Sequence, residues 1–147
     1  MAPARTPAIA RRVLTCLCAL LCILALATGC SSAGPELSLT AATARSFHEA
    51  LANDQPAVAC DLLAPGTREE LEQSAETSCP EALADAGLPE TTTVTSADVY
   101  GDNARVILAG DTGDTVFLAR FGTQWKVTAA GCKPRPDLPY DCDVKGD

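Results

Sequence analysis

The sequence of 147 residues is poor in the side chains on which several classes of function depend. It contains one histidine, and only 4% of its residues are aromatic. Lysine and arginine number 11 against 19 acidic residues, so the formal net charge is −8. Because nucleic-acid binding needs basic side chains at the phosphates, this balance argues against a nucleic-acid partner. A zinc enzyme is equally disfavoured, since its site needs a cluster of histidine and cysteine ligands.

The average charge combines two different segments. Three arginines, Arg5, Arg11 and Arg12, are the only charged residues before residue 36. Residues 30–147 therefore contain 8 basic and 19 acidic side chains, a net charge of −11. A domain this acidic is poorly suited to lying on an anionic membrane surface by charge attraction. It favours a cationic ligand or a protein as partner instead.

The first 29 residues have the pattern of an export signal. Arginines precede an uninterrupted apolar run over residues 13–27, and small residues lead from this run to Cys30. The run is ~15 residues long, shorter than the ~20 that span a bilayer as a helix. We therefore predict that residues 1–29 are a cleaved signal peptide and that the mature protein has no transmembrane helix. The pair Arg11 and Arg12 leaves open whether export uses the general or the twin-arginine route.

The end of this segment resembles the lipobox of bacterial lipoprotein precursors. Residues 26–30 read Leu-Ala-Thr-Gly-Cys, whereas the family usually has leucine at the position of Ala27. The resemblance implies cleavage between Gly29 and Cys30, a diacylglyceryl group on the Cys30 sulfur, and a location on the outer face of the cell membrane. Each buried methylene of the lipid would contribute ~0.8 kcal/mol to anchoring. An ordinary secretory signal and an uncleaved N-terminal anchor are the alternatives.

The eight cysteines divide between the signal and the mature domain. Three leave with the signal, and Cys30 is the predicted lipid acceptor. Four remain in the exported domain: Cys60, Cys79, Cys132 and Cys142. An even number there indicates two disulfides, with three possible connectivities, and short loops favour Cys60–Cys79 and Cys132–Cys142. Neither pair has CxxC spacing, so we expect no redox motif and no metal site.

The mature chain begins with a short tether and continues with helical periodicity. Residues 31–37 are small and mostly polar, and are predicted to link the lipid to a single domain over residues 38–147 with a reach of roughly 25 Å. Leu39, Thr43 and Phe47 fall on one face of a helix predicted over residues 39–53. Three further helices are expected over residues 56–63, 67–75 and 78–87, the last two opened by capping boxes (Thr67 with Glu70 and Ser78 with Glu81).

The second half changes to the alternation of strands. Four runs rich in β-branched and aromatic residues, at 92–100, 104–109, 115–121 and 124–129, are separated by short turns. Such short connections indicate hairpins, so we predict a four-stranded antiparallel meander. The expected fold is therefore α+β, with the N-terminal helices packed on one face of the sheet. After residue 129, a loop closed by Cys132–Cys142 is expected to be a solvated strap over a sheet edge, or alternatively a recognition surface with Tyr140 near its tip.

Three segments resemble the nuclear-transport-factor-2-like superfamily, also called the cystatin-like cone. They are residues 47–54 (Phe-His-Glu-Ala-Leu followed by Asp54), 59–65 (Ala-Cys-Asp-Leu-Leu-Ala-Pro) and 121–127 (Phe-Gly-Thr-Gln-Trp-Lys-Val). More narrowly, the chain resembles small actinobacterial exported lipoproteins of uncharacterised function. The resemblance implies a pocket between sheet and helices, in which the superfamily often uses aspartate and histidine as acid and base. The candidate pocket residues here are Phe47, Leu63, Phe117, Arg120 and Trp125.

The individual candidates for chemistry have structural explanations that we prefer. His48 follows the core-facing Phe47 and is turned ~100° from it, so we expect a solvent-facing side chain with an ordinary pKa rather than a catalytic base. Arg120 is expected to extend past the sheet edge into solvent, with a pocket anion as the alternative. Trp125 is expected in the core. Residues 111–114 (Asp-Thr-Gly-Asp) resemble half of a calcium loop, but a hairpin turn explains them.

No nucleophile–base set or phosphate loop emerges from the sequence. The leading hypothesis is a non-enzymatic binding or accessory module without cofactor or metal, anchored by lipid on Cys30 outside the cell membrane. A small pocket enzyme on the same fold (an isomerase, dehydratase or hydrolase) is the first alternative, and a structural component of the envelope is the second. A deep polar cavity with at least two converging titratable groups would favour the enzyme.

Overall fold

The computed structural model describes residues 34–110 and 114–146 of the chain. The predicted signal peptide, the junction at Cys30 and residues 31–33 lie outside the described residues, as do residues 111–113 of the calcium-like loop and residue 147. The described part begins with four helices: α2 (Pro35–Ala52), α3 (Pro56–Leu62), α4 (Pro65–Ala75) and α5 (Cys79–Asp85). Six strands follow: β1 (Val94–Tyr100), β2 (Asn103–Leu108), β3 (Thr115–Phe121), β4 (Gln124–Arg135), β5 (Leu138–Asp141) and β6 (Val144–Lys145). The predicted α+β class is confirmed.

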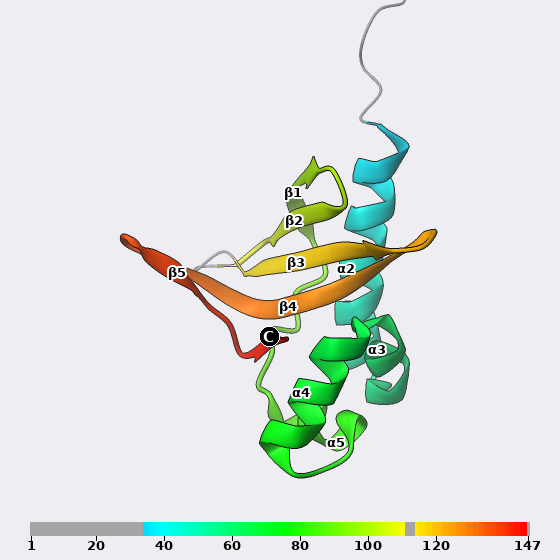
Figure 1. Cartoon of the computed structure of the whole chain (residues 1–147), viewed down its shortest axis with the longest axis vertical. Helices are drawn as coiled ribbons and strands as arrows, with labels where there is room; N and C mark the ends of the chain where they lie inside the picture. Colours follow the sequence, from blue (N-terminus) through cyan, green and yellow to red (C-terminus); the bar gives the residue numbers. More distant parts are fainter. Residues whose placement is uncertain (1–33, 111–113, 147) are drawn as a thin grey trace, which may run out of the picture. The chain divides into compact units, whose positions relative to one another are not determined.

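The strands form an antiparallel meander in the order β1-β2-β3-β4-β5, and β6 also pairs with β4. The predicted count of four strands was too low, because β4 continues to Arg135 instead of ending at residue 129. Pro134 and Pro136 suggested a loop. The hairpin that contains them lies at the edge of the sheet, where proline is tolerated because the position of its missing N–H faces solvent and not a neighbouring strand. The strand then turns at Asp137, which has a φ of 57°. This hairpin extends past the ends of β2 and β3 (Figure 1).

Proline, not a side-chain cap, marks the start of each helix. All four helices carry a proline at the first or second position, where its missing N–H has no intrahelical partner in any case. Both predicted capping boxes were wrong. Thr67 lies inside α4 and donates to the carbonyl of Thr128 on β4 at 3.0 Å, and Ser78 precedes α5 without a side-chain cap. The predicted tether was also too long, because α2 already begins at Pro35.

The core lies between α2 and one face of the sheet. Its fully buried side chains include Phe47 from α2 and alternate residues of the central strands, among them Val106, Val116, Leu118 and Val127. Figure 1 shows α2 crossing behind the strands, with α4 and α5 below them. Within residues 34–110 and 114–146, no helix packs on the opposite face of β1–β4, which explains the clear alternation of buried and less buried residues along β2.

Both predicted disulfides are present. Cys60–Cys79 joins α3 to the first residue of α5, and Cys132–Cys142 closes the base of the β4–β5 hairpin. Beyond this hairpin, β6 lies along Ala129 and Ala130 of β4 and so covers part of that strand's edge. The disulfide-closed loop is therefore not the strap: residues 133–141 form an exposed projection, and β6, which follows the loop, covers the sheet edge.

Candidate functional site

The five candidate pocket residues do not enclose a pocket. Phe47, Leu63 and Trp125 are at most 5% exposed and fill the core. Phe117 lies on the other face of the sheet, because its neighbours Val116 and Leu118 face inward, and its ring packs edge-on against Tyr140 with centroids 5.0 Å apart. The prediction of a single pocket lined by these residues was therefore wrong.

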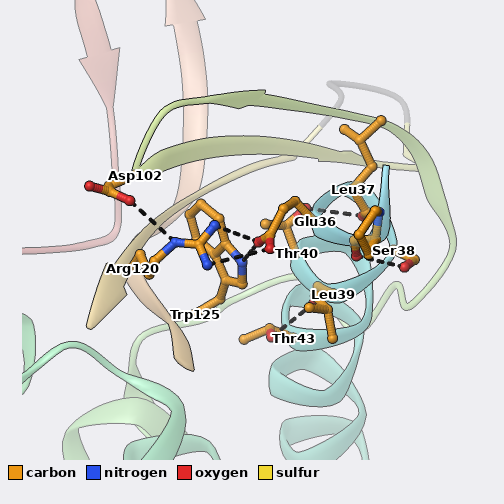
Figure 2. A network of polar contacts seen from close by, with 10 residues as sticks. Glu36, Leu37, Ser38, Leu39, Thr40, Thr43, Asp102, Arg120 and Trp125 are labelled. Carbon is orange, nitrogen blue, oxygen red and sulfur yellow. Dashed lines mark hydrogen bonds and ion pairs between the residues drawn. The ribbon is translucent and has the colours of Figure 1, made fainter. Parts of the chain in front are cut away.

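Arg120 was expected to extend past the sheet edge into solvent. Instead, its side chain turns toward the first turn of α2. Its Nη2 lies 2.6 Å from Oε2 of Glu36, and its Nε lies 3.2 Å from Oδ1 of Asp102. The guanidinium carbon is 4.7 Å from the centroid of the Trp125 ring, and Figure 2 shows the two side chains stacked between Asp102 and Glu36. Trp125 Nε1 donates to the same Glu36 oxygen at 2.8 Å. A carboxylate, a guanidinium and an indole thus meet at one point.

This network fixes the start of α2 to the ends of β3 and β4. The hydrogen bond from Trp125 and the bonds and charge of Arg120 stabilise ionised Glu36, which lowers the pKa of its carboxyl. Glu36 comes six positions after Cys30 in the sequence. Sequence reasoning missed it, because the residue was assigned to the tether and its partners are 84 and 89 positions away. The arrangement is well suited to holding the point at which the chain enters the domain.

His48 is fully buried, which contradicts the prediction of a solvent-facing side chain. The buried face of α2 runs through Thr40, Ala44, Phe47 and His48, so it lies one residue further along than the stripe that begins at Leu39, which is 50% exposed. His48 Nδ1 lies 2.9 Å from the carbonyl oxygen of Pro89. A carbonyl only accepts, so Nδ1 carries the hydrogen and, in the neutral ring, Nε2 presents a lone pair.

The lone pair of His48 faces a buried carboxyl group. Oδ2 of Asp114 lies 3.6 Å from Nε2, and both atoms are buried without a hydrogen-bond partner among the residues that the structure describes. Burial, and after it the charge of Asp143, raise the pKa of Asp114 to about 6, although Lys133 and the backbone N–H groups of Thr115 and Cys132 oppose this shift. Burial also lowers the pKa of His48, although its bond to Pro89 opposes the change.

These directions determine what the pair can do. Below about pH 6 the protonated Asp114 can donate to Nε2, whereas above it two acceptors face each other with no proton between them. Sequence reasoning missed the pair for two reasons. The helix face was placed one residue early, and Asp114 was interpreted only as a turn residue. A histidine beside a carboxylate is a combination used for acid–base chemistry, but both side chains are at most 6% exposed here.

A hollow lies elsewhere, at the end of α2. It has a volume of about 430 Å³ and is bounded by the end of α2, the start of α3, α5 and the segment before β1. Its lining residues are Leu51, Asp54, Pro56, Leu83, Ala84, Gly87, Leu88 and Glu90. Two carboxylates and no basic side chain line it. We call this hollow the α2–α5 groove.

Comparison with known proteins found no matching family model, no matching curated protein and no matching solved structure. Within residues 34–110 and 114–146, no helix is long and apolar enough to cross a membrane. The same residues contain no group of three histidine, cysteine, aspartate or glutamate side chains arranged to hold a metal ion. The function must therefore be argued from the geometry of the groove, the buried pair and the network at Glu36.

Proposed function

We propose that the protein is a lipoprotein, anchored through Cys30 on the outer face of the cell membrane, that acts as a non-enzymatic binding or accessory module. The order of basic residues, apolar run, small residues and cysteine in residues 1–30 supports the anchor. The two disulfides support an oxidising compartment outside the cytoplasm, because such bonds rarely persist in a reducing one.

The observation that carries the binding role is the separation of the groove from the acid–base pair. The α2–α5 groove is lined by apolar side chains and two carboxylates, and none of its lining residues is a histidine, serine, cysteine or lysine. The acid–base pair of His48 and Asp114 is not among the groove's lining residues and is buried. Both carboxylates of the groove are exposed, so it offers contacts without the buried, converging titratable groups of an enzyme site, which favours binding over catalysis.

Charge distribution supports a cationic partner at the helical end. In the sequence, residues 34–93 contain 11 acidic and 2 basic side chains, whereas residues 94–147 contain 8 acidic and 6 basic ones. The helices therefore carry nearly all of the excess negative charge, and a positive ligand or protein surface is attracted to that end. The network around Glu36 supports the anchoring role, because it fixes the first turn of α2 to the sheet only six positions after the proposed lipid-bearing Cys30.

Metabolic labelling with a fatty acid tests the anchor. We expect the full chain to incorporate label and to fractionate with membranes, whereas Cys30→Ala should be unlabelled and should keep its signal peptide. Cys16→Ala is the matched control, since it removes a cysteine from the apolar run and should leave labelling intact. Label on the Cys30→Ala protein would contradict the proposal. Chemical crosslinking of the labelled protein in cells would then identify what it contacts.

A second candidate, a small pocket enzyme, is favoured by one observation. His48 and Asp114 face each other at 3.6 Å, and burial shifts both of their pKa values, as in many acid–base sites. For catalysis, a substrate would have to reach Nε2. The two candidates therefore differ in whether the imidazole is accessible in the native protein.

A further inference from the structure

The α2–α5 groove has the size and lining of a small-molecule site. Its volume of about 430 Å³ falls in the range of ~300–1,000 Å³ that is typical of ligand pockets. Three leucines, Leu51, Leu83 and Leu88, are among its apolar lining residues. Leu83 is almost fully buried and belongs to the core, which gives the groove a firm floor.

The charged side chains of the groove favour a positive ligand. Asp54 and Glu90 line it, and no lining residue is basic. The 18-residue helix α2 ends at Ala52 and α5 ends at Asp85, so two helices direct their C-terminal ends, which carry partial negative charge, toward this region. Helix α3 begins there with Pro56, whose ring has no N–H to offer an anion.

The two carboxylates stand on segments that are already ordered. The N–H of Asp54 donates to the carbonyl of Leu51 at 3.1 Å, and Gln55 donates to Ala50 at 2.8 Å, which holds Asp54 in the left-handed conformation with a φ of 55°. On the other wall, the residue before Glu90 is Pro89. Its carbonyl accepts a hydrogen bond from Nδ1 of the buried His48, which fixes the backbone beside Glu90. A preformed site loses little conformational entropy when a ligand binds.

We propose that the α2–α5 groove binds a small aliphatic amine, with its ammonium group at Asp54 and Glu90 and its hydrocarbon chain against the leucines. The inference rests on the proposed binding role and names the ligand class for it. An anion would meet two carboxylates and two negative helix ends. A neutral alkane chain would leave the carboxylates without a partner. An alkylammonium ion satisfies both halves of the lining.

Calorimetric titration of the full lipoprotein in nonionic micelles tests this proposal with hexylamine as the probe. Hexan-1-ol, which has the same chain without the charge, is the matched ligand, and empty micelles give the blank. We expect hexylamine to bind more tightly than hexanol and to weaken when salt is raised from 0.15 to 0.5 M, because salt screens partly exposed charges. Equal affinities for the two ligands, or no binding of hexylamine, would overturn the proposal.

Neutral isosteres locate the site. Asp54→Asn keeps a residue type that tolerates a positive φ, and Glu90→Gln keeps the shape of its side chain. Each should weaken hexylamine binding about two- to fivefold, as expected for a partly exposed ion pair, and the double variant about tenfold. Glu69→Gln on α4 removes one negative charge outside the groove and should leave the affinity unchanged. If the double variant bound hexylamine as well as the parent, the amine would lie elsewhere and the proposal would fail.

Lipid labelling of the same preparations separates this inference from the proposed function. A labelled protein that fails to bind hexylamine refutes only the amine site. An unlabelled protein refutes the anchor, whatever the titration shows. Conversion of hexylamine to a product, detected by mass spectrometry, would refute a non-enzymatic role.

Discussion

Replacing Asp114 by asparagine should stabilise the protein at alkaline pH and have little effect in acid. The pKa of Asp114 is raised by burial from 3.8 to about 6. A raised carboxyl pKa means that the folded state binds the proton more tightly than the unfolded state. The stability that Asp114 contributes is thus fully present below pH 3.8 and is lost as the pH rises through 6.

The magnitude follows from the size of that shift. A change of about 2 pH units corresponds to about 3 kcal/mol, at 1.36 kcal/mol for each unit, which is the cost of ionising Asp114 in the fold. Asparagine cannot ionise, and its amide can donate to Nε2 of His48, where the carboxylate offers only another acceptor. Asp114→Asn should therefore raise the free energy of unfolding by up to about 3 kcal/mol at pH 8 and change it by less than about 1 kcal/mol at pH 4.

Urea unfolding of the parent and the variant at pH 4 and pH 8 measures both values. Asp141→Asn is the matched control, because this exposed side chain should change stability by no more than about 0.5 kcal/mol at either pH. If Asp114→Asn destabilised the protein at pH 8, the carboxylate would be a required partner of a protonated His48, and our assignment of a neutral imidazole would be refuted.

Three further predictions concern other parts of the fold. His48→Ala should lower the free energy of unfolding by about 2–4 kcal/mol in chemical denaturation, since it opens a cavity and leaves the Pro89 carbonyl unpaired; a loss within 0.5 kcal/mol would restore the solvent-facing interpretation. Glu36→Gln should speed hydrogen exchange in the first turn of α2 and alter Trp125 fluorescence, whereas Glu49→Gln should do neither, and unchanged exchange would show that the network does not hold the helix. Replacing both Cys132 and Cys142 by alanine should cost at most about 3 kcal/mol by the loop-entropy estimate, and a larger loss in thermal unfolding would mean that the hairpin supports the core.

Local patterns in the sequence were sufficient for the α+β class, the meander and both disulfides. Turn residues and alternating runs determine hairpins over a few positions, and a short loop favours pairing of its own cysteines. The strand count failed after residue 129, because three prolines suggested a loop where an edge hairpin tolerates them.

The candidate site depended on features that local patterns do not contain. The buried face of α2 includes Thr40 and Ala44, two small residues, while the more hydrophobic Leu39 is half exposed, so ranking by hydrophobicity displaced the face by one position and turned His48 outward. The partners of Glu36 lie on β3 and β4, far along the chain, and no spacing rule connects them. The α2–α5 groove likewise depends on how helix ends meet, which only the assembled fold determines.

Chemical modification of the single histidine is the most direct test of binding against catalysis. Diethyl pyrocarbonate acylates accessible neutral imidazoles, and the chain has one histidine, so the extent of reaction at the peptide containing His48 reports one site. We predict that His48 of the native protein, which is fully buried, stays unmodified at pH 7 and reacts fully after unfolding in urea. Native His48 that reacted at the rate of the unfolded chain would show that Nε2 is open to small molecules, and would place the pocket enzyme ahead of the binding module.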